Sequence, residues 1–340
     1  LKGVAKYIDD YNFSDLVHIF TVRSEHAYGK IINIDKSQAE KMPGVLGVVT
    51  CDMIPGKNAV PLVMFDEPFL AKDYVRFHGE PVALVVAESY EQAAMAAPFV
   101  KVEVEPLKPI LNIKEALDEN APKLHGTDNI FSRYNVEKGN AEEAIKKAAH
   151  VFEKEYTTPY QEHAYLETNG AIAVPGIEDS ITVYGSMQCP FYVHDAVAAA
   201  AGIDKNKVRV VQTTTGGGFG GKEDFPSVVA GHATIVAKLF NRPAKLIYKR
   251  EEDIISSSKR HPSLVKMKVG TDENGKIVAA IIEYYTDGGA YSTLTPIVLW
   301  RGTVHALGPY ECDHIHIKSF GVATNKVPCG AYREIGRAHV

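Results

Sequence analysis

A glycine-rich stretch, residues 216–223, constrains this chain more than any other part of its 340 residues. Five glycines flank Phe219, and the stretch directly follows a Val- and Thr-rich run at residues 208–215. Glycine permits positive φ and close backbone approach, so successive amide N–H groups can be aimed at one anionic ligand. The stretch, called here the glycine loop, therefore predicts an oxygen-rich ligand held against the main chain beside an aromatic ring.

The same loop also satisfies G-x-G-x-x-G, the dinucleotide-binding fingerprint. That fingerprint expects an acid about 20 residues further on, at the end of the next strand. The next predicted strand, residues 244–248, ends in Lys249 and Arg250 instead. A nucleotide-binding module without a redox metal therefore remains an alternative of another class. A loose surface loop is disfavoured because it would leave Phe219 in solvent.

Length, charge and cysteine usage limit the function classes. With 340 residues, of which 45% are hydrophobic, the chain is long enough for two domains with cores of their own. The formal net charge of −5 argues against nucleic acid or an anionic membrane as a partner. No apolar run approaches the roughly 18 residues of a membrane helix. Four cysteines without a C-x-x-C pattern indicate a reducing, cytoplasmic location and no iron–sulfur cluster held by this chain.

The order of predicted elements indicates an α+β chain in two parts. Strands and a helix alternate over residues 1–110, a polar linker rich in helix and strand breakers covers 111–135, and the second part runs over 136–333. The helix in the first part is predicted at residues 89–97, with Ser89 as its N-cap. In that second part, Asp272-Glu273-Asn274-Gly275 lies between two apolar runs and predicts a hairpin. No internal repeat is visible.

Several collinear segments resemble the xanthine dehydrogenase/aldehyde oxidase family of molybdenum hydroxylases. In chain order these are residues 7–10, 23–27 and 75–82, then Tyr165-Leu166-Glu167-Thr168, Ser186-Met187-Gln188, the glycine loop and Gly330-Ala331-Tyr332-Arg333. The resemblance implies an N-terminal α/β-hammerhead-like domain at 1–110, followed by the first part of a molybdopterin-binding α+β domain at 136–333. It also implies that the chain is an N-terminal fragment of a molybdopterin-binding large subunit.

The resemblance implies a molybdopterin cofactor, with the cytosine dinucleotide form as one option, whose metal is held by the pterin and not by side chains. Gln188 would face the molybdenum centre, and Gly218, Phe219 and Gly220 would contact the cofactor through backbone N–H groups and the aromatic ring. The main chain of Arg333 would approach the same centre. From the residues alone, a surface glutamine, a core phenylalanine and a solvated arginine stay open as alternatives.

Glu223 and Arg301 match the two positions that purine hydroxylases of this family fill with Glu and Arg. An acid can bind a ring nitrogen, and an arginine can donate to a carbonyl and stabilise charge that builds on the ring. Ion pairs elsewhere are the alternative, since most acids and arginines are solvated. Cys189 is next to Gln188, so a place near the site is an alternative, but it is interpreted as a buried structural thiol.

These matches imply a hydroxylase subunit that oxidises a purine, such as hypoxanthine or xanthine, with water as the oxygen source. An aldehyde or an N-heterocycle such as nicotinate is the alternative substrate within the family. FAD and 2Fe-2S centres are expected on partner subunits. The general-base glutamate of the family is expected beyond residue 340, so we assign no catalytic residue here and expect the isolated fragment to be inactive.

After Arg333 the sequence departs from the family pattern. Residues 334–340 read Glu-Ile-Gly-Arg-Ala-His-Val, which the start of a common sequencing adapter encodes in frame. We interpret these seven residues as translated adapter and assign them no function.

Overall fold

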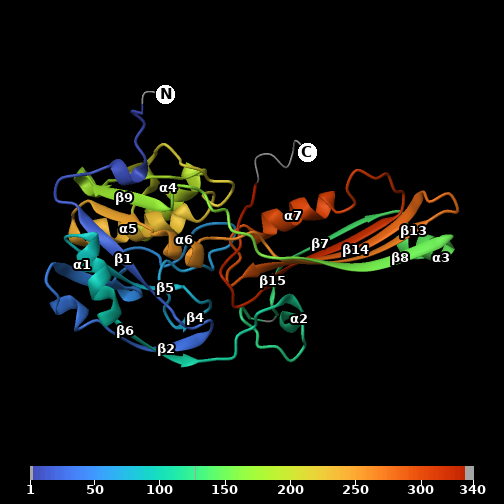
Figure 1. Ribbon diagram of the computed structural model, residues 1–340, viewed down its shortest axis with the longest axis horizontal. Coiled ribbons are helices and arrows are strands. Elements are labelled where there is room, and N and C mark those ends of the chain that lie inside the picture. Colours follow the sequence, from blue (N-terminus) through green and yellow to red (C-terminus); the bar gives the residue numbers. More distant parts are fainter. Residues whose placement is uncertain (1–2, 127, 334–340) are drawn as a thin grey trace.

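The computed structural model describes residues 3–126 and 128–333. Residues 334–340, interpreted above as adapter sequence, lie outside the described residues. Figure 1 shows a broad lobe that contains most of the helices and an elongated lobe formed by a long twisted sheet. Helices and mixed sheets occur in both lobes, so the α+β class expected from the sequence is confirmed.

A seven-stranded sheet forms the centre of the broad lobe. In spatial order it contains β11 (Val208–Gln212), β10 (Ile181–Gly185), β9 (Gly170–Pro175), β12 (Ala244–Ile247), β1 (Val17–Arg23), β5 (Pro81–Ala87) and β3 (Val45–Thr50). β1 pairs in parallel with β12, and Val17 lies opposite Ala244. The sheet thus takes strands from both sides of the predicted linker, and the division into domains at 1–110 and 136–333 stays a prediction.

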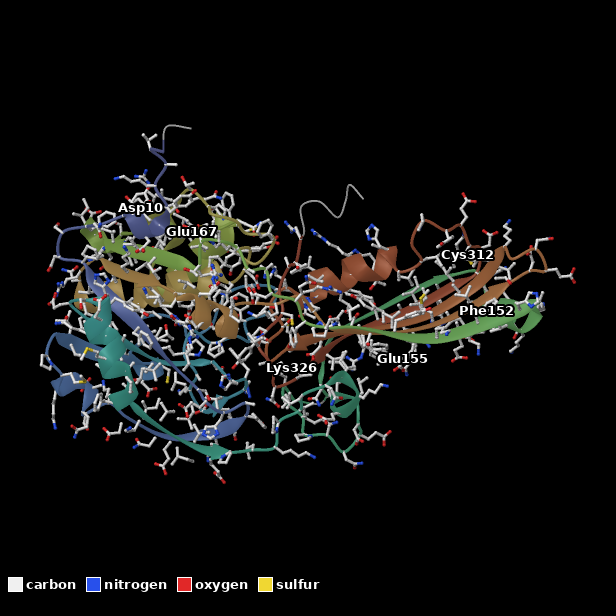
Figure 2. All side chains as sticks on the ribbon, in the orientation of Figure 1. Asp10, Phe152, Glu155, Glu167, Cys312 and Lys326 are labelled. Carbon is white, nitrogen blue, oxygen red and sulfur yellow. The ribbon has the colours of Figure 1, made fainter. Side chains whose placement is uncertain are left out.

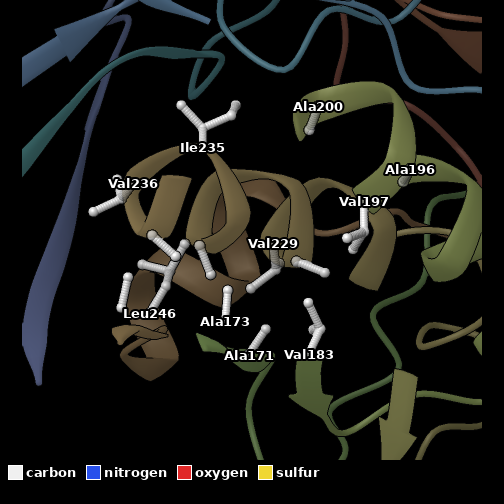
Figure 3. Packing of buried hydrophobic residues seen from close by; sticks show 14 of the residues in the cluster. Ala171, Ala173, Val183, Ala196, Val197, Ala200, Val229, Ile235, Val236 and Leu246 are labelled. Carbon is white, nitrogen blue, oxygen red and sulfur yellow. The ribbon is translucent and has the colours of Figure 1, made fainter. Parts of the chain in front are cut away.

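Two helices, α4 (Pro190–Ala201) and α5 (Pro226–Phe240), pack on this sheet and on each other. Their contact is rich in alanine and valine, and Figure 3 shows Val197 facing Val229 above Ala171 and Val183 of the sheet. Small side chains allow the backbones to approach closely while still removing apolar surface from water. This packing fixes the ends of β10 and β11, from which the candidate site is built.

The rest of the broad lobe is formed mainly by N-terminal residues. A three-stranded sheet contains β4 (Tyr74–Val75), β2 (Gly29–Asp35) and β6 (Lys101–Pro106). The expected helix after β5 is α1 (Tyr90–Ala96), and its predicted cap is confirmed because Ser89 accepts a hydrogen bond from Gln92 N at 3.2 Å. Short 3-10 helices are found at Ile8–Asp10 (η1), Ala39–Lys41, Cys51–Met53, Ala97–Phe99, Ile177–Asp179 and Lys205–Lys207.

The elongated lobe is a five-stranded sheet. Its spatial order is β7 (Ile130–Lys138), β15 (Ile315–Ala323), β14 (Ile277–Gly289), β13 (Ser263–Thr271) and β8 (His150–Thr158). The predicted hairpin is confirmed between β13 and β14, where Gly275 has φ +81°. Helix α7 (Thr295–His305) packs on β7, β14 and β15, and α3 (Ala141–Lys147) on β13 and β14.

Two elements lie inside the segment predicted as a linker. Helix α2 (Ile113–Ala116) and the start of β7 both fall within residues 111–135. The helix is short and capped by Asn112, so its polar sequence gave no periodic signal. The remaining helix, α6 (Arg250–Ser256), follows β12. Among the helices of the described residues, none has the length and apolar character needed to cross a bilayer.

Candidate functional site

The glycine loop joins β11 to α5 at the end of the seven-stranded sheet. Gly217, Phe219 and Gly220 have φ values of +97°, +50° and +96°. Phe219 is the informative one, because a side chain at positive φ is uncommon and such strain gathers at functional sites. Its carbonyl accepts a hydrogen bond from Arg333 N at 2.6 Å, and 37% of its surface is exposed. The loop is therefore held in an unusual shape that presents an aromatic ring.

Gln188 follows β10 directly and reaches the glycine loop. Its Oε1 accepts hydrogen bonds from the amides of Gly220 (2.9 Å) and Lys222 (3.2 Å). The backbone is tied as well, since Gln188 N donates to the carbonyl of Lys222 at 2.6 Å. Two donors fix which end of the side-chain amide is oxygen, so Nε2 must point the other way. Among the described residues Nε2 has no hydrogen-bond partner and remains available to a ligand.

Two of the glycines permit this close packing. A Cβ on Gly218 would lie 2.5 Å from Gln188 Oε1, and one on Gly220 would lie 2.7 Å from the carbonyl oxygen of Ala331. Both distances are too short for a real side chain. The glycines therefore let the loop fit between Gln188 on one side and the segment 330–333 on the other.

The structure brings Gln188, Gly218, Phe219, Gly220 and Arg333 together, as the resemblance led us to expect. One detail differs from the expectation. The amide of Gly220 donates to Gln188 Oε1 and is not free to bind a ligand in this structure. Of the two backbone donors expected from Phe219 and Gly220, only that of Phe219 has no partner among the described residues.

Glu223 lies at the end of the loop and is nearly buried. Its Oε1 accepts a hydrogen bond from Arg333 Nη2 at 2.7 Å, which makes an ion pair. Its Oε2 is buried without a hydrogen-bond partner in the structure. An unpaired buried carboxylate oxygen is costly, so this atom is an acceptor that a bound molecule could satisfy.

The interpretation of Cys189 as a buried structural thiol is wrong. The side chain is only half-buried. Burial and the neighbouring carboxylate of Glu223 raise the pKa of the thiol to about 11. The Cys189 thiol is therefore protonated at neutral pH beside Glu223, and the signal for it in the sequence was only its position next to Gln188.

Arg301 lies on α7 with its side chain exposed. Within the described part of the chain its guanidinium makes no hydrogen bond or ion pair, and Glu223 is paired by Arg333 instead. The structure therefore does not bring Arg301 into contact with Glu223. The expected clamp of these two residues on one ring stays a prediction.

Sequence reasoning missed His163, which supports the segment 330–333. Its Nε2 lies 2.9 Å from the carbonyl oxygen of Ala331, and its ring centre lies 4.8 Å from that of Tyr332. Burial lowers the pKa of His163, so the ring is neutral at pH 7. No motif marks this histidine, because its partner is a backbone carbonyl far away in the sequence.

Two family models match the chain. Residues 2–108 match one described as "Aldehyde oxidase and xanthine dehydrogenase, a/b hammerhead domain", and residues 124–340 match one described as "Molybdopterin cofactor-binding domain". The chain belongs to the xanthine dehydrogenase/aldehyde oxidase family. The family expected from the motifs is thereby confirmed.

Relatives of similar identity within this family are named for different substrates. The chain is 35% identical to the nicotinate dehydrogenase large molybdopterin subunit of Eubacterium barkeri, over 99% of its own length and 79% of that protein. It is also 35% identical to a probable xanthine dehydrogenase subunit of Bacillus subtilis, over 99% of its own length and 45% of that protein. Similar identity to proteins with different named substrates shows the family but not the substrate.

Solved structures of the family superpose closely. The aldehyde oxidoreductase of Desulfovibrio desulfuricans gives a TM-score of 0.92 at 26% identity, over 97% of this chain and 38% of that one. Quinoline 2-oxidoreductase of Pseudomonas putida gives 0.88 at 28% identity, over 98% of this chain and 44% of that one. The chain thus spans less than half of these xanthine dehydrogenase/aldehyde oxidase family structures.

Proposed function

We propose that this chain holds molybdopterin at the glycine loop as part of a molybdenum hydroxylase. The observation that carries the proposal is the fixed amide of Gln188. Its oxygen is held by Gly220 and Lys222, so its N–H donors point away from these two amides and have no partner among the described residues. The donor set consists of a side-chain amide and the backbone N–H of Phe219. Such uncharged donors fit the oxygens of an organic metal cofactor and do not compete as metal ligands.

When bound, molybdopterin supplies the two-electron acceptor for hydroxylation. The chain supplies position and shielding. Gln188 would donate a hydrogen bond toward the molybdenum centre, and the ring of Phe219 would exclude water from it. Gly218 and Gly220 allow the close approach of the backbone, and Arg333 completes the wall through its main-chain bond to Phe219.

We propose a purine of the hypoxanthine or xanthine type as the substrate. Glu223 supports this, because its buried Oε2 lacks a partner and can accept a ring N–H. Arg333 holds the other oxygen, and the Cys189 thiol lies beside the same carboxylate. Arg301 is the proposed second substrate contact, although it is exposed in this structure. An N-heterocycle such as nicotinate, or an aldehyde, is the alternative within the family.

The remaining parts of the enzyme are proposed from the family. FAD-binding and 2Fe-2S subunits would carry electrons away, and the general base would come from beyond residue 340. The isolated 340-residue chain would then lack hydroxylase activity. The cytosine dinucleotide form of the cofactor and a cytoplasmic location are also proposals.

The test is metal analysis and a substrate panel on the native complex that contains this chain. We expect molybdenum in stoichiometric amount and dye reduction with hypoxanthine or xanthine faster than with nicotinate or benzaldehyde. Faster turnover of nicotinate or of the aldehyde would replace the purine assignment. A complex without molybdenum that binds nucleotides would favour the nucleotide-binding alternative.

A further inference from the structure

Lys222 lies directly behind the glycine loop and has no exposed surface. Its Nζ donates to Glu167 Oε2 at 3.0 Å and to Ser186 Oγ at 2.9 Å, and lies 4.7 Å from the centre of the Tyr165 ring. A buried ammonium is costly unless it is paired and hydrogen-bonded. Glu167, Ser186 and the Tyr165 ring stabilise the ammonium at this position. The charge therefore fixes the position of the Lys222 side chain.

Glu167, the partner of Lys222, is also hydrogen-bonded to the other end of the loop. Its Oε2 accepts hydrogen bonds from Gly216 N at 2.7 Å and Ser186 Oγ at 2.5 Å. Burial opposes ionisation, but the bonds from Ser186, Gly216 and Lys222 outweigh it and hold the pKa of this carboxyl below its usual range. Its Oε1 accepts from Ile8 N at 3.3 Å, so Glu167 also meets the N-terminal segment near Asp10 (Figure 2). One carboxylate therefore holds both ends of the glycine loop.

The backbone that carries Glu167 is itself anchored. Arg250 Nη2 donates to the carbonyls of Tyr165 (2.7 Å) and Leu166 (2.9 Å). Thr168 Oγ1 donates to the carbonyl of Tyr248 at 2.7 Å, and Tyr248 belongs to the core. The position of the carboxylate is thus set by bonds that do not involve the loop, as a preorganised site requires.

The main chain of Lys222 is hydrogen-bonded to Gln188, so the position of Lys222 affects that of Gln188. Its amide donates to Gln188 Oε1 at 3.2 Å, and its carbonyl accepts from Gln188 N at 2.6 Å. Ser186, the second acceptor for the ammonium, lies two residues before Gln188 at the same strand end. A shift of Lys222 would therefore move one of the two bonds that orient the side-chain amide of Gln188, and also the backbone bond that holds residue 188.

We infer that Lys222 is a positioning residue for Gln188 and that Glu167 is its anchor. Lys222 acts only through the amide that it orients, since its ammonium faces the protein interior. The inference rests on the proposed function, in which Gln188 faces the molybdenum centre. It adds that the ion pair of the buried Lys222 with the partly buried Glu167, behind the loop, helps to set the direction of that amide.

The first experiment measures turnover per bound molybdenum in the native holoenzyme. Lys222→Met conserves volume and removes the charge. We expect kcat to fall by about tenfold to a hundredfold, as for a misplaced catalytic contact, with little change in KM. In the Gln188→Ala background the same substitution should lower kcat no further. An unchanged kcat, or losses that multiply independently, would overturn the inference.

The second experiment needs no cofactor and no activity. Hydrogen exchange of the Gly220 and Lys222 amides in the full chain freed of cofactor should speed up in Lys222→Met. Lys245→Met is the matched control, because Lys245 is another buried lysine whose ammonium bonds Asp9 at 2.8 Å and not the loop. We expect unchanged exchange at both loop amides in that control. Equal acceleration in the two variants would contradict the inference.

A third variant covers the case in which Lys222→Met leaves Glu167 charged and the protein unfolded. Glu167→Gln combined with Lys222→Met removes both charges, and neutral replacements of buried ion pairs are commonly tolerated. Faster loop exchange in this double variant supports the inference, and wild-type exchange rates refute it. If the wild-type enzyme lacked hydroxylase activity, the proposed function would fail, while the exchange rates would still decide the role of Lys222.

Discussion

Gln188 Oε1 and the amide nitrogen of Gly220 lie 2.9 Å apart, although 32 residues separate them in the sequence. This bond joins the end of β10 to the glycine loop and leaves the amide donors of Gln188 without a partner among the described residues. The loop can make it only because Gly218 has no side chain to block the approach. The proposed chemistry therefore depends on a contact that packing, and not proximity in the chain, creates.

Gln188→Glu tests the donor without removing the acceptor. A carboxylate can still accept from Gly220 and Lys222 but cannot donate toward the cofactor. We expect kcat to fall by roughly 10²- to 10³-fold, the usual loss for one preorganised donor, while thermal stability stays near wild type. Gln188→Ala should lose both kcat and stability. Wild-type turnover in Gln188→Glu, measured per bound molybdenum, would show that the donor is not used.

Gly220→Ala should disrupt the contact between the loop and the segment 330–333. Gly220 has φ +96°, and its Cβ would meet the carbonyl oxygen of Ala331 at 2.7 Å. Gly275→Ala is the matched control, because Gly275 has φ +81° with no atom within 4 Å of a Cβ. A side chain at positive φ costs about 1–2 kcal/mol by itself. We expect a larger loss of unfolding free energy and loss of bound molybdenum only in Gly220→Ala, so equal losses in both would contradict the steric argument.

Glu223→Gln should weaken purine turnover selectively. The substitution keeps the shape but removes the charge that Arg333 pairs and that a ring N–H would meet. A hydrogen bond to a charged group contributes about 1.5–3 kcal/mol, so kcat/KM for hypoxanthine should fall roughly 10- to 100-fold, and that for benzaldehyde much less. Arg301→Met should show the same selectivity if Arg301 contacts the substrate. Equal losses on both substrates would indicate that these residues only maintain the structure.

Glu80 predicts a pH dependence of stability away from the site. Burial raises its pKa to about 7, although Tyr291 and Arg76 donate hydrogen bonds to it. The folded state therefore keeps this proton at a pH where the unfolded chain has lost it. Stability contributed by the proton is present below about pH 4.5 and is lost as the pH rises through about 7.

Denaturant unfolding at pH 5 and pH 8 measures this effect. The free energy of unfolding should be lower at pH 8 than at pH 5, and Glu80→Gln should make this difference smaller by up to about 3 kcal/mol. Glu103→Gln, on the exposed face of β6, is the control and should leave the decrease unchanged. If the unfolding free energy changed with pH by the same amount in all three proteins, Glu80 would already be ionised in the folded state.

The sequence by itself determined the features that a few neighbouring residues encode. The glycine loop, the hairpin at Asp272 to Gly275 and the cap at Ser89 depend on local turn and capping chemistry, and the structure contains all three. The motifs also identified the family and the residues that gather around the loop. Local conformational preferences are readable because they depend on residues close together in the chain.

Only the tertiary structure decided how distant segments meet. The parallel pairing of β1 with β12 could not be derived from either strand, because the residues of a short strand do not specify its partner. The neighbourhood of Cys189, Glu223 and Arg333 and the burial of Lys222 against Glu167 likewise depend on which strand ends the sheet brings together. A charged residue in a sequence is expected in solvent, and only packing shows that Lys222 is enclosed where its charge can orient Gln188.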